Sequence, residues 1–192
     1  LELPAKVEFA GYNQVFQELL DPGSLLNGNS RGMNVLLIRP EDWLKDAGGN
    51  ADRSAALKRV AGEFVDAVKS AASHAQVPIL TILCPRSVDS TTDTSLSAAI
   101  DEAEATIATG MRNVANLHLI TSDELLRQYS VRDYYDASGD ELGRVPFTPV
   151  FFTALGTAIM RRLHVLNRTP HKVIVLDLDN TLWSGVCGED GA

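Results

Sequence analysis

Short apolar segments alternate with longer amphipathic ones along this chain, and the alternation limits the folds open to it. Residues 33–38 and 77–84 are apolar almost throughout, and 117–120 is a third short run of this kind. Such runs are typical of strands buried in a parallel sheet. Apolar residues recur at helical spacing within 57–72, 96–111 and 152–163. We therefore expect an α/β fold in three layers, a mostly parallel sheet with helices on both faces.

Local signals place the ends of several elements. Residues 5–10 alternate polar and apolar side chains, which predicts a short strand. Asn13 is expected to cap a helix that stops at 21–23, where Asp, Pro and Gly follow one another. Thr121 and Glu124 form a capping-box pattern, which predicts the start of another helix.

The stretch 130–145 is polar and has no helical or strand periodicity. Thr148 followed by Pro149 then predicts the start of a helix. Ligands of open α/β sheets bind at the loops that follow the carboxyl ends of the strands. The stretch 130–145 is the longest candidate for a functional loop.

The composition excludes several classes of partner. A chain of 192 residues that is 45% hydrophobic can bury a sizeable core. Its formal net charge of -8 repels phosphate backbones and anionic lipids, so we expect neither a nucleic acid nor a membrane partner. No segment resembles a transmembrane span or a signal peptide. The two cysteines, Cys84 and Cys187, are far apart and lack metal-ligand spacing, as expected of a protein in a reducing compartment. We therefore expect a cytoplasmic protein.

The last part of the chain carries the most informative motif. Residues 173–178 form an apolar run into Asp177 and Asp179, with Thr181 following. Two carboxylates two positions apart at a strand end point to the same side and can hold Mg²⁺. In this pattern Asp177 is expected to attack a phosphoryl group, and Asp179 to act as acid and base. An acidic turn without chemistry is the simpler alternative.

The interruption at 167–170 predicts a domain boundary, with one domain over 1–168 and the start of a second over 169–192. The second segment resembles motif one and the adjacent flap of FkbH-like proteins of the haloacid dehalogenase superfamily, subfamily IIIC. The similar residues are Asp177-Leu178-Asp179-Asn180-Thr181-Leu182-Trp183, Gly185-Val186 and Gly188-Glu189-Asp190-Gly191. Upstream, Tyr12-Asn13-Gln14-Val15-Phe16, Leu20-Asp21-Pro22, Glu41-Asp42-Trp43-Leu44, Val145-Pro146-Phe147-Thr148 and Ala154-Leu155-Gly156 are similar to that family's N-terminal domain. The resemblance implies an SGNH-hydrolase-like, flavodoxin-like domain followed by the first strand of a phosphotransfer domain.

The resemblance also implies a function. FkbH-like proteins dephosphorylate a glyceryl unit derived from a bisphosphorylated glycerate and load it onto an acyl carrier protein, in polyketide or nonribosomal peptide biosynthesis. The acceptor is the thiol of the carrier's phosphopantetheine. Asp177 and Asp179 would be the catalytic residues and the Mg²⁺ ligands. We expect this chain alone to be inactive, because later phosphate- and metal-binding groups of the family are absent from it, and we expect its N-terminal domain to lack a first strand.

Other residues are weaker candidates. Thr181, Tyr12, Asn13, Arg86 and Arg144 are candidates for substrate binding, although a capping role is sufficient to explain Asn13. Cys187 could relay an acyl group as a thioester, or simply pack.

Arg144 stands where many relatives have His, and an arginine cannot act as a base near neutral pH. Two alternatives to a transferase remain for the N-terminal domain. One is a noncatalytic module that binds the carrier or the substrate, and the other is an SGNH-type esterase.

Overall fold

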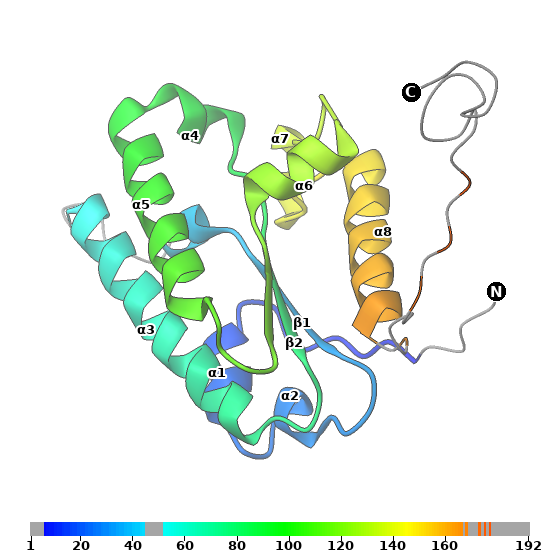
Figure 1. Ribbon diagram of the computed structural model, residues 1–192. Coiled ribbons are helices and arrows are strands. Elements are labelled where there is room, and N and C mark those ends of the chain that lie inside the picture. Colours follow the sequence, from blue (N-terminus) through cyan, green and yellow to red (C-terminus); the bar gives the residue numbers. More distant parts are fainter. Residues whose placement is uncertain are drawn as a thin grey trace, which may run out of the picture.

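The computed structural model describes residues 6–44, 52–166, 168, 173, 175 and 177. Within them three strands form one parallel sheet in the order β1-β2-β3 (Figure 1): β1 (Asn34–Ile38), β2 (Ile79–Leu83) and β3 (Leu117–Ile120). Ile79 lies opposite Asn34 on one side and Leu117 on the other. The expected parallel α/β sheet is confirmed.

Helices cover both faces of this sheet. In chain order they are α1 (Val15–Leu20), α2 (Leu25–Gly28), the 3-10 helix η1 (Pro40–Leu44), α3 (Arg53–His74), α4 (Val88–Thr92), α5 (Thr94–Met111), α6 (Ser122–Tyr129), α7 (Ala137–Gly143) and α8 (Pro149–Leu166). Helices α1, α3 and α5 lie on one side of the sheet, and α6 and α8 on the other (Figure 1). None of the helices in the described part of the chain is long and apolar enough to cross a membrane.

The strand β2 connects the two cores because its side chains alternate between the faces of the sheet. Ile79 and Leu83 belong to the core under α3 and α5, whereas Leu80 and Ile82 belong to the core under α6 and α8. All five residues of β2 are buried, as the apolar run predicted. In β1 the prediction of complete burial is wrong, since Leu37 is 45% exposed.

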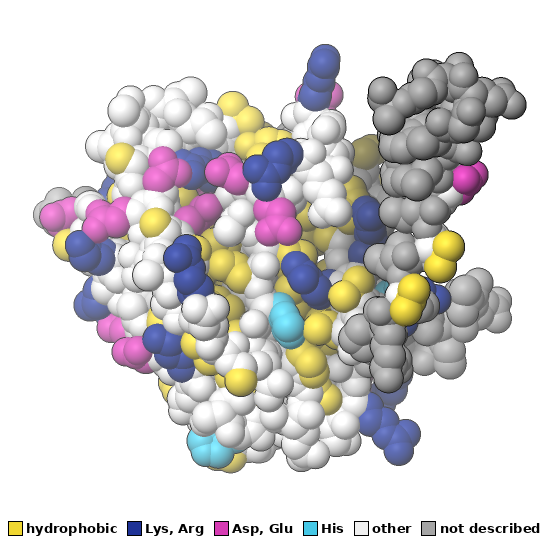
Figure 2. Space-filling view, viewed as in Figure 1, with side chains coloured by type: hydrophobic (Ala, Val, Ile, Leu, Met, Phe, Trp, Pro, Cys, Tyr) yellow, Lys and Arg dark blue, Asp and Glu magenta, His cyan; other side chains and the backbone are white. Residues whose placement is uncertain are grey.

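Helices α3 and α5 pack tightly at Gly110, where an added Cβ would lie 2.5 Å from Val65 Cγ1. Phe64 on α3 is fully buried and stacks edge-on against Phe16 of α1. On the outer surface of this layer, acidic and basic side chains are interspersed (Figure 2). One such pair, Lys58 and Glu102, joins α3 to α5 at 2.6 Å.

Two expectations near the N-terminus are wrong. Residues 6–10 form no strand and are exposed, because no neighbouring strand pairs with them in the described structure. Asn13 is not the N-cap residue of α1, because Gln14 occupies that position. Asn13 has a φ of 57° in the left-handed region, which asparagine tolerates well. The stop after Leu20 is confirmed.

The stretch 130–145 is not a loop without regular structure. It contains α7, whose cap Asp136 accepts a hydrogen bond from the Gly139 N–H at 2.9 Å. Ser130 and Arg144, with φ of 39° and 56°, end α6 and α7 in the left-handed region. The helix was missed because it has seven residues and buries none of its apolar side chains.

Both of the predicted helix starts beyond β3 are confirmed. The Glu124 N–H donates to Thr121 Oγ1 at 3.2 Å, and the Phe151 N–H donates to Thr148 Oγ1 at 3.4 Å. Half of the predicted strand at 173–178 lies outside the described residues. Of the residues that are described, Val173 and Val175 are exposed.

Candidate functional site

The carboxyl edge of the sheet is where ligands are expected, and a buried arginine occupies it. Arg39 directly follows β1, and its side chain is 4% exposed. Its Nε–H and one terminal N–H donate to the two oxygens of Asp42, at 2.9 and 2.7 Å. The other terminal nitrogen donates to Asp140 of α7 at 2.8 Å. The arginine therefore joins the end of β1 to a helix that lies 101 residues away in the sequence.

The same guanidinium also faces a third carboxylate. Glu41 Oε1 lies 3.4 Å from Arg39 and accepts a hydrogen bond from the Ser87 N–H at 2.8 Å. Ser87 follows β2, and its hydroxyl contacts Glu41 Oε2 at 3.1 Å and the Ser90 hydroxyl at 2.8 Å. These contacts fix the loop after β1 against the start of α4.

Two tyrosines complete this edge from the α7 segment. The Tyr135 hydroxyl donates to Asp140 at 3.1 Å, and the Tyr134 hydroxyl donates to the Arg86 carbonyl at 3.1 Å. Burial, together with the hydrogen bond to Asp140, raises the pKa of Tyr135 to about 12, so this phenol stays protonated at neutral pH. We call Arg39, Glu41, Asp42, Tyr135 and Asp140 the edge network.

The electrostatics of the edge network indicate that it has a structural role and not a catalytic one. Burial by itself lowers the pKa of Arg39, but the hydrogen bonds to Asp42 and Asp140 outweigh this effect, and the pKa is raised above its ordinary value. The guanidinium therefore stays charged, and it uses both terminal nitrogens and Nε within the network. A buried arginine that is already paired with carboxylates is a poor site for an incoming phosphate.

No activated nucleophile lies at this edge in the described structure. Burial raises the pKa of the Cys84 thiol to about 12, which keeps it a thiol at neutral pH. Of the histidines that the structure describes, His74 ends α3, His118 lies on β3 and His164 lies on α8. None of the three has a hydrogen bond with the edge network. A serine, histidine and acid arrangement, as an esterase would use, is not formed there.

A second polar cluster lies beside β3. The Ser122 hydroxyl donates to Glu104 Oε2 at 2.6 Å, whereas Glu104 Oε1 is buried with no hydrogen-bond partner among the described residues. Burial raises the pKa of Glu104, and the Ser122 hydrogen bond opposes that shift. The candidate anion ligand Arg86 is close in sequence to the end of β2 and pairs instead with Ser97 at 2.7 Å and with Asp101.

Of the other predicted site residues, Arg144 contacts the edge network through its backbone, and the rest lie apart from it or outside the described structure. Tyr12 is 73% exposed at the turn before α1, where Asn13 follows it. Arg144 ends α7, and its backbone N–H donates to the Asp140 carbonyl at 3.1 Å. Asp177 is exposed. Asp179, Thr181 and Cys187 lie outside the described residues.

The sequence interpretation missed the edge network. One signal for it was available: Arg39, Glu41 and Asp42 come immediately after a buried strand, where the ligand sites of α/β sheets begin. No comparable signal marks Asp140, which meets Arg39 only through the folding of the chain.

The described residues also do not form a complete metal site. No group of three or more His, Cys, Asp or Glu side chains among them is arranged to hold a metal ion. Asp177 can still contribute a hard carboxylate oxygen of the kind that Mg²⁺ prefers.

No protein-family model matches this chain, and none of the curated proteins matches it. Its fold is similar to the crystal structure of the N-terminal part of the protein BF1531 from Bacteroides fragilis, which contains a phosphatase domain and is complexed with Mg. The TM-score is 0.65 at 17% sequence identity, and the similarity covers 95% of this chain and 50% of that one. This chain therefore spans half the length of that phosphatase-containing structure, and the likeness shows a shared fold.

Proposed function

We propose that this chain is the N-terminal part of an Mg²⁺-dependent phosphatase or transferase of the FkbH-like type, with its phosphoryl chemistry at Asp177 and Asp179. The observation that carries the proposal is the combination of two findings. The fold is similar to half of a structure that contains a phosphatase domain. The chain also carries Asp177-Leu178-Asp179-Asn180-Thr181 after an apolar run, in the order that such chemistry requires.

The donor set suits magnesium. Asp177 and Asp179 would hold the ion through carboxylate oxygens, and the similar structure was crystallised with Mg. When bound, the ion would supply positive charge that neutralises the phosphate oxygens. Asp177 would act as the nucleophile toward phosphorus, while Asp179 would hold and return the proton of the leaving oxygen. Further metal ligands would come from the rest of a longer protein.

In this proposal the domain over 1–168 is a noncatalytic module that binds the carrier or the substrate. The edge network supports the noncatalytic part of this role, because its only arginine is engaged by Asp42 and Asp140. Cys84 is protonated at neutral pH, and no described histidine bonds to the network. An esterase site therefore has less support than a binding role.

The finer form of the proposal concerns the product. The enzyme would dephosphorylate a bisphosphorylated glycerate and place the glyceryl group on the phosphopantetheine thiol of an acyl carrier protein. The support for this substrate and this partner is the resemblance of the segment from Asp177 to Gly191 to FkbH-like proteins.

The first test is phosphate release by the longer protein that contains this chain. With an aryl phosphate as substrate, release should require Mg²⁺ and stop when the ion is chelated. Asp177→Asn should lower the rate on the order of 10³-fold or more, because an amide cannot replace the attacking carboxylate. Asp66→Asn, an exposed change on α3, is the matched control and should have no effect. Equal rates for the two variants would refute the assignment of Asp177.

A further inference from the structure

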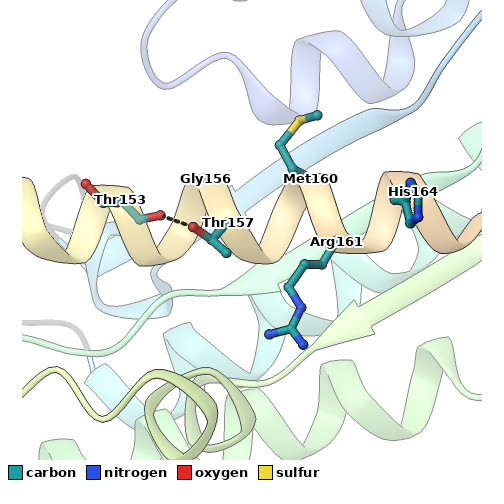
Figure 3. Close-up of a pocket in the computed structure, with 6 residues that line it drawn as sticks. All are labelled: Thr153, Gly156, Thr157, Met160, Arg161 and His164. Carbon is teal, nitrogen blue, oxygen red and sulfur yellow. Dashed lines mark hydrogen bonds between the residues drawn. The ribbon is translucent and has the colours of Figure 1, made fainter. Parts of the chain in front are cut away.

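Helix α8 has a second face that packs against none of the layers described above. Its core face carries Phe151, Ala154, Leu155 and Ala158, which are buried. On the other side, residues three and four positions apart line a shallow hollow of about 470 Å³ (Figure 3). They are Thr153, Gly156, Thr157, Met160, Arg161 and His164. We call this side the free face of α8.

The free face is less polar than its residue types suggest. The Thr153 hydroxyl donates to the Pro149 carbonyl at 2.9 Å. The Thr157 hydroxyl donates to the Thr153 carbonyl at 2.8 Å, as the dashed line in Figure 3 shows. Both hydroxyls are thus used by the helix itself, and the methyl groups remain available for contact. Gly156 has nothing within 4 Å of an added Cβ, so another backbone can approach closely there. Surface helices usually present a charged outer face.

The charge of α8 is also unusual for this chain. The segment from Pro149 to Leu166 contains no Asp or Glu, whereas the whole chain has 25 acidic residues against 17 basic ones. On α3, Arg53, Lys58 and Arg59 each pair with an acidic side chain. On α8 the structure shows no ion pair for Arg161 within the described residues. The free face is therefore suited to an acidic and partly apolar partner.

Chain geometry identifies which partner is nearest. Helix α8 ends at Leu166, and the expected second domain starts at 169. Six residues separate Leu166 from Val173, so that domain is tethered within about 25 Å of the helix end. The free face from Thr153 to His164 is about 16 Å long at the helical rise per residue. A domain held this close has a high effective concentration at this surface.

The sequence of the tethered segment has the complementary charge. Apart from Asp177 and Asp179, which the proposed function assigns to Mg²⁺, residues 169–192 contain Glu189 and Asp190 against the single lysine Lys172. The structure that shares this fold is twice as long as the matched region and contains a phosphatase domain. Val165, near the end of α8, is 64% exposed and extends the apolar surface to the carboxyl end of the helix.

We infer that the free face of α8 is the docking surface for the phosphatase-type domain that begins at 169. This inference rests on the proposed function in that it takes such a domain to follow. Docking there would hold the catalytic carboxylates at a fixed position relative to the binding module. Bulk or negative charge placed at Gly156 should then separate the two domains.

The test uses the longer protein with Gly156→Glu, and Gly62→Glu as the matched control. Gly62 lies within α3 and, like Gly156, has nothing within 4 Å of an added Cβ. Small-angle X-ray scattering gives the radius of gyration, and limited trypsin digestion gives the rate of cleavage after Arg168 and Lys172. We expect Gly156→Glu to increase the radius of gyration and to accelerate cleavage several-fold. Gly62→Glu should match the wild type, and thermal melting should show both variants folded.

Identical scattering and cleavage for the two variants and the wild type would overturn the inference. A wild-type dimer that Gly156→Glu dissociates would also overturn it, because the free face would then belong to a second copy. Mg²⁺-dependent phosphate release separates this test from the proposed function. Activity without domain docking would remove the docking surface alone, whereas docking without activity would remove the proposed chemistry alone.

Discussion

Replacing Arg39 should destabilise the fold strongly, because it would remove a buried cation that pairs with several carboxylates at once. The Arg39 side chain is 4% exposed, and Asp140 lies 2.8 Å from it with 9% of its side chain exposed. Removing one partner of a buried ion pair costs about 3–5 kcal/mol. Arg39→Met should therefore lower the free energy of unfolding by about this amount, which corresponds to a melting temperature about 6–20 °C lower. Urea denaturation at pH 7, followed by circular dichroism, measures the free energy directly.

Arg59→Met is the matched control. Arg59 pairs with Glu63 on the surface of α3 at 2.7 Å, with side chains 65% and 52% exposed. An exposed pair of this kind contributes about 0.3–0.5 kcal/mol. In the double variant with Asp140→Asn, part of the loss caused by Arg39→Met should be recovered, because one of the buried negative charges that Arg39 balanced is removed as well. A loss below about 1 kcal/mol for Arg39→Met, or one equal to that of the control, would refute the role of the edge network.

Three further changes test other parts of the structure. Gly110→Ala should destabilise the protein by about 1–3 kcal/mol through its clash with Val65. Gly62→Ala, in open space, should stabilise it by up to about 1 kcal/mol. Equal effects of the two changes in urea denaturation would contradict this packing. Because burial raises the pKa of Glu104 in the folded state, stability is lost as pH rises from the unfolded pKa through the folded one. Glu104→Gln should therefore raise the melting temperature at pH 7 but not at pH 3, and a gain at both would be inconsistent with titration of this group. Thr148→Ala should cost about 1 kcal/mol through loss of the cap of α8, and an unchanged urea midpoint would exclude that role.

The layers could be predicted from sequence because burial imposes local periodicity. In β2 the alternation of Ile79 and Leu83 with Leu80 and Ile82 reflects two cores, one on each face. In α3 the apolar residues recur every three or four positions toward the core. These patterns repeat within a few residues and need no knowledge of distant contacts.

The edge network could not be predicted in the same way. Arg39 and Asp140 meet only because the sheet and α7 bring together segments 101 residues apart. The prediction of a strand at 5–10 was wrong for a related reason, since alternation of polar and apolar residues does not by itself provide a neighbouring strand to pair with. The Asp177 and Asp179 pair is a local motif and so was visible in the sequence, and its roles remain a prediction.

Mass spectrometry of an acyl carrier protein tests the central claim most directly. A phosphopantetheinylated carrier would be incubated with bisphosphoglycerate, Mg²⁺ and the longer protein that contains this chain. The proposed function predicts that the carrier gains the mass of a glyceryl group, and that the gain disappears with Asp177→Asn but persists with Asp66→Asn. An unchanged carrier mass across several carriers, or a gain that survives Asp177→Asn, would contradict it.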